Sequence, residues 1–396
     1  MVALSPAAPP AHVLAARNAV VLVFALNGLL MASLVARVPD LRSGLDLGNG
    51  ALGLLLLCIA FGSVLALPSA GFLIHRHSAG WVVRLGVVAD GIGLIVGGTG
   101  AALGSVPLAG AGLFVFGIGT GVWDVAMNVE GAEVERGLRR SIMPRFHAAW
   151  SFGSIAGAAV GVPAAALHVP LPVHLGVLSV VAGVAVSRGT GSFLPALESA
   201  PTERGLSAWR EPRVLAIGVM VLAFAVVEGT ANDWLSLALI DGYDVAHWVG
   251  VSGYALFVCA MTVGRLTGPV VLDRWGRAPV LWVTTVAAAA GILLVVLGSH
   301  PVVVGLGILV WGLGAALGFP VGMSAAADDP TRAAARVSVV STIGYGAFLG
   351  GPPLLGWLGD HVGTLDALLA VAFLMLPAAL TVFASRTPAV TSATSA

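Results

Sequence analysis

Two acid–amide pairs lie inside long apolar stretches of this 396-residue sequence. Asp124 is followed four residues later by Asn128, and Glu228 is followed four residues later by Asn232. On a helix, residues four apart lie on one face, a turn from each other. A carboxyl group can bind and release a proton, and an amide can donate and accept hydrogen bonds. The pattern predicts two polar patches that could bind a polar solute or a proton.

Three further residues could contribute to such patches or to their support. Trp123, beside Asp124, could stack on a ligand, and Asn27 is a polar residue of the first apolar stretch. Asp90 lies in the third apolar stretch, where we expect a structural partner rather than a role in transport. The sequence has no Cys/His cluster with metal-ligand spacing and no lysine for a Walker motif, so we expect no metal and no cofactor.

The composition is that of an integral membrane protein. Hydrophobic residues make up 58% of the chain and charged residues 10%, with a mean hydropathy of +0.99. Soluble domains carry about 25% charged residues. The formal net charge of zero gives no bulk attraction to nucleic acid, so none is expected as a partner. The chain should instead lie in the lipid bilayer, where an acid at membrane depth normally faces a protein interior or a water-filled path.

Apolar stretches long enough to cross a membrane, about 20 residues each, predict twelve helices. Their expected ranges are 17–37, 50–73, 80–103, 107–129, 146–167, 172–188, 213–240, 247–271, 279–298, 301–323, 334–357 and 365–385. The fold class is therefore all-α, with twelve transmembrane helices. A polar link divides them into an N-terminal bundle (1–188), a linker (189–212) and a C-terminal bundle (213–396), each bundle with six helices.

The arginines predict the orientation of these helices. With both termini in the cytoplasm, sixteen of the 19 basic residues fall at cytoplasmic ends or loops, as the positive-inside rule requires. Arg37 and Arg42 fall outside, and Arg265 lies within the eighth helix. All the basic residues are arginine, which suggests a GC-rich bacterial genome, so the expected location is the inner (plasma) membrane, with many spans.

An internal repeat supports two related halves. The turn LIHRHS at 73–78 matches the turn LDRWGR at 272–277, and Arg76 and Arg274 are 198 residues apart, half the chain. Two matching six-helix halves are a transporter layout, with a binding site expected near the midplane. A membrane enzyme would need a convergent catalytic set, and the sequence shows none, so we expect no enzymatic activity.

The twelve helices and the D-R-x-G-R turn at 273–277 resemble the major facilitator superfamily over the whole chain. Within it, several short strings resemble the fucose-permease-like branch and its YbjJ-type bacterial relatives. They are R-V-P-D-L-R at 37–42 with G-A-L-G at 50–53, D-x-x-x-N-x-E-G at 124–131, E-x-E-R at 133–136, His147 before S-F-G at 151–153, and E-G at 228–229 before D-W at 233–234. The turn after the second helix departs from the family pattern, with His75 for an acid and Ala79 for an arginine.

The resemblance implies roles for particular residues. In the sugar-importing relatives an acid-x-x-x-Asn on the fourth helix is similar to Asp124 and Asn128, and its acid takes part in proton coupling. The arginine of the eighth helix and the D-R-x-G-R turn act in the family as a conformational latch. The latch residues carried over to this chain are Arg265, Asp273, Arg274, Arg277 and, from the first-half turn, Arg76.

We therefore expect a monomeric secondary transporter that moves a small, sugar-like or other polar solute, with protons as the coupling ion. Two alternatives stay open: efflux of a hydrophobic drug or metabolite, and a non-transporting receptor with the same fold. Efflux members often carry a Gly-Pro pair in the fifth helix, whereas this chain has Gly157 and Ala158 there, which favours uptake or exchange. Substrate or coupling residues are expected to be Asp124, Asn128, Glu228, Asn232, Asn27 and Trp123.

Overall fold

The structure is a computed structural model that describes residues 10–47, 49–195 and 205–386. These residues form helices and turns and no β-strand. Twelve helical segments are long and apolar enough to cross a membrane, which confirms the predicted all-α fold. The chain divides into two compact units, Met1–Gly205 and Leu206–Ala396. Of the predicted linker, residues 196–204 lie outside the described residues.

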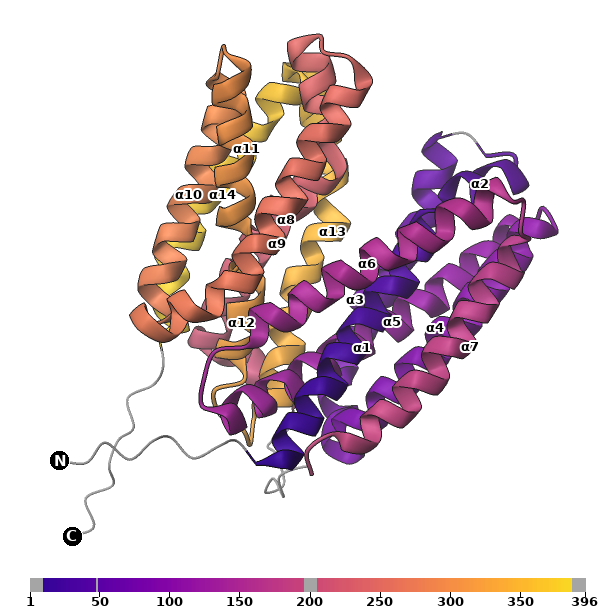
Figure 1. Ribbon diagram of the computed structural model, residues 1–396, viewed down its shortest axis with the longest axis vertical. Helices are drawn as coiled ribbons and strands as arrows, with labels where there is room; N and C mark the ends of the chain where they lie inside the picture. Colours follow the sequence, from indigo (N-terminus) through magenta and orange to yellow (C-terminus); the bar gives the residue numbers. More distant parts are fainter. Residues whose placement is uncertain (1–9, 48, 196–204, 387–396) are drawn as a thin grey trace. The chain divides into compact units, whose positions relative to one another are not determined.

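Unit 1 is a bundle of long helices with one short helix, α2, near one end (Figure 1). Its elements are α1 (Ala11–Val35), α2 (Val38–Gly44), α3 (Asn49–Arg76), α4 (Ala79–Ala102), α5 (Val106–Leu138), α6 (Met143–Ala166), α7 (Leu171–Gly189) and the 3-10 turn η1 (Thr190–Ser192).

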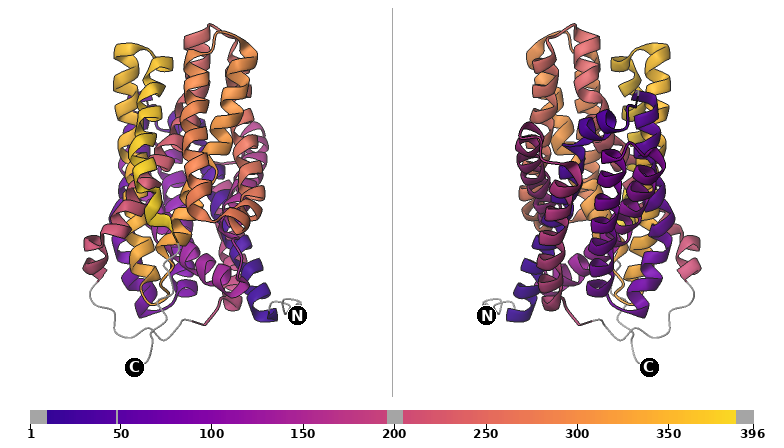
Figure 2. Two further views of the ribbon diagram at one scale, coloured as in Figure 1. Left: turned by 90° about the vertical axis from the view of Figure 1, so that its left-hand side faces the viewer. Right: turned by 90° about the vertical axis from the view of Figure 1, so that its right-hand side faces the viewer.

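Unit 2 repeats this plan, and its long helices run alongside one another in both side views (Figure 2). Its elements are η2 (Gly205–Arg210), α8 (Pro212–Tyr243), α9 (His247–Trp275), α10 (Arg277–Leu297), α11 (Pro301–Ala315), α12 (Gly318–Ala326), α13 (Ala333–Val362), α14 (Thr364–Thr381) and η3 (Val382–Ser385).

Glycines bring helices of unit 1 into backbone contact. A Cβ atom added at Gly153 of α6 would overlap the carbonyl oxygen of Ala25 in α1, and one at Gly93 of α4 would lie 2.7 Å from the carbonyl oxygen of Gly112 in α5. Such close approach is how small residues stabilise helix pairs in lipid. It fixes the register of α6 on α1 and of α5 on α4, and so places the polar residues that these helices carry.

The fourth and tenth spans differ from their predicted forms. Helix α5 continues to Leu138, nine residues beyond its expected end at 129, and stops where Arg139 adopts a left-handed conformation with φ 53°. The tenth span, predicted as one helix, is broken between α11 and α12 at Ala316 and Leu317. Pro320 explains the break, because it has no N–H to bond the carbonyl of residue 316 and its ring crowds that carbonyl.

Candidate functional site

Three polar side chains of unit 1 form a hydrogen-bonded row between α5 and α6. The Asn128 Nδ2 donates to the Asp124 backbone oxygen at 2.9 Å and to Asp124 Oδ1 at 3.3 Å. The His147 Nε2 lies 3.2 Å from Asn128 Oδ1. Because an amide oxygen only accepts, His147 is the donor in this contact. Their exposed fractions are 5% for Asp124, 0% for Asn128 and 8% for His147, so the row, which we call the Asp124 row, is buried.

The α5–α6 connection explains why His147 faces Asn128. Glu135, near the end of α5, accepts hydrogen bonds from the backbone N–H groups of Ile142 at 2.7 Å and Met143 at 2.8 Å. It thereby satisfies donors at the start of α6 that the helix itself leaves unpaired. His147 follows one turn after Met143, so this cap sets which way its ring points.

Helix α1 closes the other side of the row with an aromatic contact. Phe24 meets the His147 ring edge-on at a centroid distance of 5.1 Å and stacks on Phe146 at 5.8 Å. One turn further along α1, Asn27 Oδ1 accepts a hydrogen bond of 2.9 Å from Trp150 Nε1. The predicted residue Asn27 is therefore engaged in holding α1 to α6.

Trp123 lies elsewhere in unit 1. Its side chain is 0% exposed, and its Cβ packs against Gly86 of α4. The indole Nε1 has no hydrogen-bond partner among the described residues. The structure therefore places Trp123 in the α4–α5 contact, and not in the Asp124 row with its sequence neighbour.

In unit 2, Glu228 of α8 forms an ion pair with Arg265 of α9. The Arg265 Nη2 lies 2.7 Å from Glu228 Oε2, and the side chains are 3% exposed for Arg265 and 16% for Glu228. The sequence assigned these residues to different tasks, coupling for Glu228 and a latch for Arg265, and the structure brings them together. Asn232, one turn after Glu228, is exposed and makes no side-chain hydrogen bond among the described residues.

The other predicted latch residues lie at one end of unit 2 or are exposed. Arg277 donates to Asp328 Oδ1 at 2.6 Å and to Ser324 Oγ at 2.7 Å, and Arg213 donates to Asp328 Oδ2 at 2.6 Å. Asp273 and Arg274 are exposed, as is Arg76 of unit 1. Arg265 lies two turns before Asp273 on α9 and pairs away from this charge cluster.

Sequence reasoning missed several polar partners. Asp328 was not singled out, nor was Glu211, which pairs with Arg332 at 2.7 Å and Arg336 at 2.8 Å. These contacts join segments 51 or more residues apart, and only the clustering of opposite charges near the predicted helix ends could have suggested them. Groups of three or more potential metal ligands do not occur among the described residues.

The profile of the Major Facilitator Superfamily matches residues 20–352. The chain belongs to this superfamily. As a member of a transporter superfamily, it is a membrane transporter. A transporter of Sinorhizobium fredii, y4wD, is 33% identical to it over 367 residues, which cover 88% of this chain and 94% of y4wD. The membrane protein MosC of Rhizobium meliloti is 28% identical over 93% of this chain and 90% of MosC.

Solved major facilitator structures share the fold. The human organic anion transporter MFSD10 superposes with a TM-score of 0.77 and 16% identity, covering 95% of this chain and 100% of that structure. The fucose:proton symporter FucP of E. coli superposes with a TM-score of 0.72 and 17% identity, covering 94% and 98%. At these identities the likeness establishes the fold of this superfamily member and not its substrate.

Proposed function

We propose that this transporter is a proton-coupled symporter of the bacterial inner membrane, with both termini in the cytoplasm, that moves a small polar solute by alternating access. The observation that carries the proposal is the Asp124 row: a buried acid, an amide and a histidine, hydrogen-bonded across two helices. Burying an acid at membrane depth costs free energy, so such residues are rare and commonly mark a functional site.

The row offers a way for a proton to change helix contacts. An ionised Asp124 only accepts hydrogen bonds, so it attracts the Asn128 Nδ2 with the extra strength of a charged acceptor. Protonation removes that charge and weakens the bond. The same amide accepts a hydrogen bond from His147 through its oxygen. A change in the protonation state of Asp124 on α5 can therefore alter the contact with α6 through the Asn128 side chain. A proton can shift a conformational equilibrium only through such a difference in contacts.

Asp124 is the better candidate for the proton site than Glu228. The charge of Glu228 is balanced by Arg265 at 2.7 Å, and removing a partner from a buried pair leaves an uncompensated charge. We therefore assign Glu228 and Arg265 to holding α8 against α9 in this conformation, and Asp124 to proton binding.

Structures of the same fold support proton coupling as a function by analogy. Among the structurally similar proteins are a fucose:proton symporter and a proton:xylose symporter. The organic anion transporter has a comparable superposition, so transport of an anionic solute is a competing function.

Reconstitution into liposomes that contain a pH-sensitive dye tests the proposal. A panel of sugars, nucleosides and drugs is added outside, and proton entry is recorded for the wild type and for Asp124→Asn. One solute should drive proton entry, and the variant should abolish it. Asp90→Asn is the matched control, because Asp90 is a second buried acid of unit 1, 1% exposed, that accepts a 3.2 Å hydrogen bond from Thr120 on the neighbouring helix.

Three outcomes would contradict the proposal. Equal proton entry in the wild type and in Asp124→Asn would show that Asp124 takes no part in proton coupling. Solute-driven proton movement only in the export direction would favour efflux. Ligand binding without flux in either orientation would favour a receptor.

A further inference from the structure

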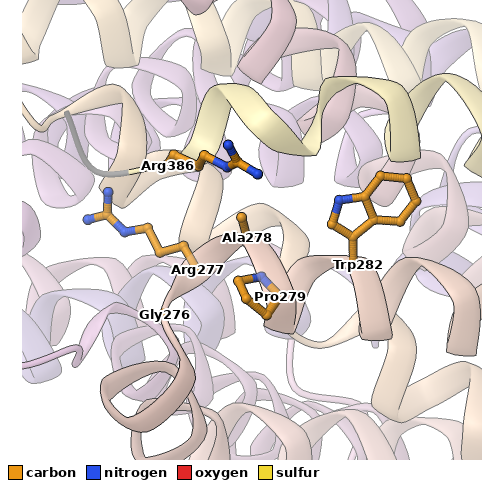
Figure 3. A pocket seen from close by; sticks show the side chains of 6 residues that line it. All are labelled: Gly276, Arg277, Ala278, Pro279, Trp282 and Arg386. Carbon is orange, nitrogen blue, oxygen red and sulfur yellow. The ribbon is translucent and has the colours of Figure 1, made fainter. Parts of the chain in front are cut away.

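A cavity of about 340 Å³ lies at one end of unit 2, beside the start of α10. It is lined by Gly276, Arg277, Ala278, Pro279, Trp282 and Arg386. Figure 3 shows the Arg277 and Arg386 side chains and the Trp282 ring around the same hollow. Its volume is within the range of small-ligand sites, about 300–1,000 Å³. None of the substrate residues proposed above lines it.

Three arginines gather around this cavity. Arg213 and Arg277 each donate to one carboxylate oxygen of Asp328 at 2.6 Å. Arg213 also donates to the Arg386 backbone oxygen at 3.1 Å. Arg213, Arg277 and Arg386 thus bring three guanidinium groups to this end of unit 2. Arg386 is exposed, lies 4.6 Å above the Phe383 ring, and forms no salt bridge with any carboxylate in the described parts of the chain.

The cavity lies at the ends of two candidate membrane spans. The candidate span formed by α10 begins at Arg277, and the span that contains α14 and η3 ends at Ser385, next to Arg386. Trp282, just inside the first of these boundaries, meets Phe383 edge-on at 5.8 Å. Tryptophan is enriched at this depth, and arginine binds phosphate groups through paired N–H donors.

We propose that this cavity, which we call the α10–α14 headgroup site, binds the phosphate of an anionic phospholipid. Arg386 would supply the main contact, because Arg277 is already engaged by Asp328 and Ser324. Trp282 and Phe383 would contact the glycerol and upper acyl region. A lipid is favoured over a soluble phosphate compound because the cavity lies where two spans meet the headgroup layer, and anionic lipids concentrate there.

Native mass spectrometry of the full-length protein tests the site. The purified protein is incubated in neutral detergent with equal amounts of dioleoyl phosphatidylglycerol and dioleoyl phosphatidylcholine, and the bound lipids are counted. The wild type should retain phosphatidylglycerol preferentially, and Arg386→Gln should lower that preference by about fivefold, the effect of one basic residue at an anionic surface. Arg210→Gln is the matched control, because Arg210 is also exposed in unit 2 and does not line the cavity.

Two further readings complete the test. The melting temperature without lipid should be the same for both variants, which excludes misfolding of these surface substitutions. Glycerol 3-phosphate, added at the concentration of the lipid, should not displace it. Equal lipid preference in Arg386→Gln and Arg210→Gln would overturn the site. Displacement by glycerol 3-phosphate as effective as by phosphatidylglycerol would show a site for a soluble phosphate and overturn the lipid assignment.

Discussion

The two units carry the same acid–x–x–x–Asn spacing and use it differently. In unit 1, the Asn128 amide donates a hydrogen bond to Asp124 and accepts one from His147. In unit 2, Glu228 turns to Arg265 on the next helix, and Asn232 is exposed. The acid of unit 1 thus meets an amide, whereas the acid of unit 2 meets a guanidinium group and forms an ion pair with it. The spacing alone therefore does not determine the chemistry; the side chain that faces the acid from the neighbouring helix does.

The largest effect is expected from breaking the ion pair of unit 2. Arg265→Met leaves Glu228 without its charged partner and should lower the free energy of unfolding by about 3–5 kcal/mol, at the lower end because Glu228 is partly exposed. Thermal unfolding in detergent, followed by tryptophan fluorescence, measures the change. The double variant Glu228→Gln/Arg265→Met removes both charges and should recover most of the loss. A double variant as unstable as Arg265→Met would show that the arginine acts through packing alone.

A smaller loss of stability is expected when the Asn128 amide of unit 1 is removed. Asn128→Ala removes both the donor to Asp124 and the buried acceptor of the His147 Nε2–H bond, which should cost about 1–3 kcal/mol of stability. Solute-driven proton entry should also fall in the liposome assay. The comparison between the units fails if Asn128→Ala keeps both wild-type stability and wild-type flux.

The cap at the start of α6 should matter less. Glu135→Ala removes the acceptor of two backbone N–H groups and should destabilise by about 0.5–2 kcal/mol, the range for helix caps. Because the cap orients His147, proton entry should fall as well. Glu135→Gln keeps an acceptor oxygen and should retain most of both properties; if it behaves like Glu135→Ala, charge rather than capping is the important property.

The smallest effect is expected at Asn232. Asn232→Ala changes an exposed amide and should alter stability by no more than about 0.5 kcal/mol. Its partner in the comparison is Asn128→Ala, made and measured alongside it. A loss at Asn232 as large as that at Asn128 would mean that the amide of unit 2 acts in a conformation different from this one.

The fold was largely predictable, because apolar stretches of about 20 residues can only be spans in a chain of this composition. The Asp124–Asn128 contact also followed from helix geometry. The His147 contact did not, because it depends on the glycine-set packing of α1 on α6 and on the Glu135 cap. The Glu228–Arg265 pair was not predictable either, because the sequence does not fix how α8 rotates against α9.

The discontinuity between α11 and α12 has a mechanical consequence. Its counterpart in unit 1, α5, is an uninterrupted rod of 33 residues, so a displacement at one end is transmitted to the other. In unit 2 the segment that bears Ser324 and leads to Asp328 is joined to α11 through two turn residues, Ala316 and Leu317. We expect that joint to act as a pivot, about which the Asp328 charge cluster can rearrange while α11 stays packed against α10.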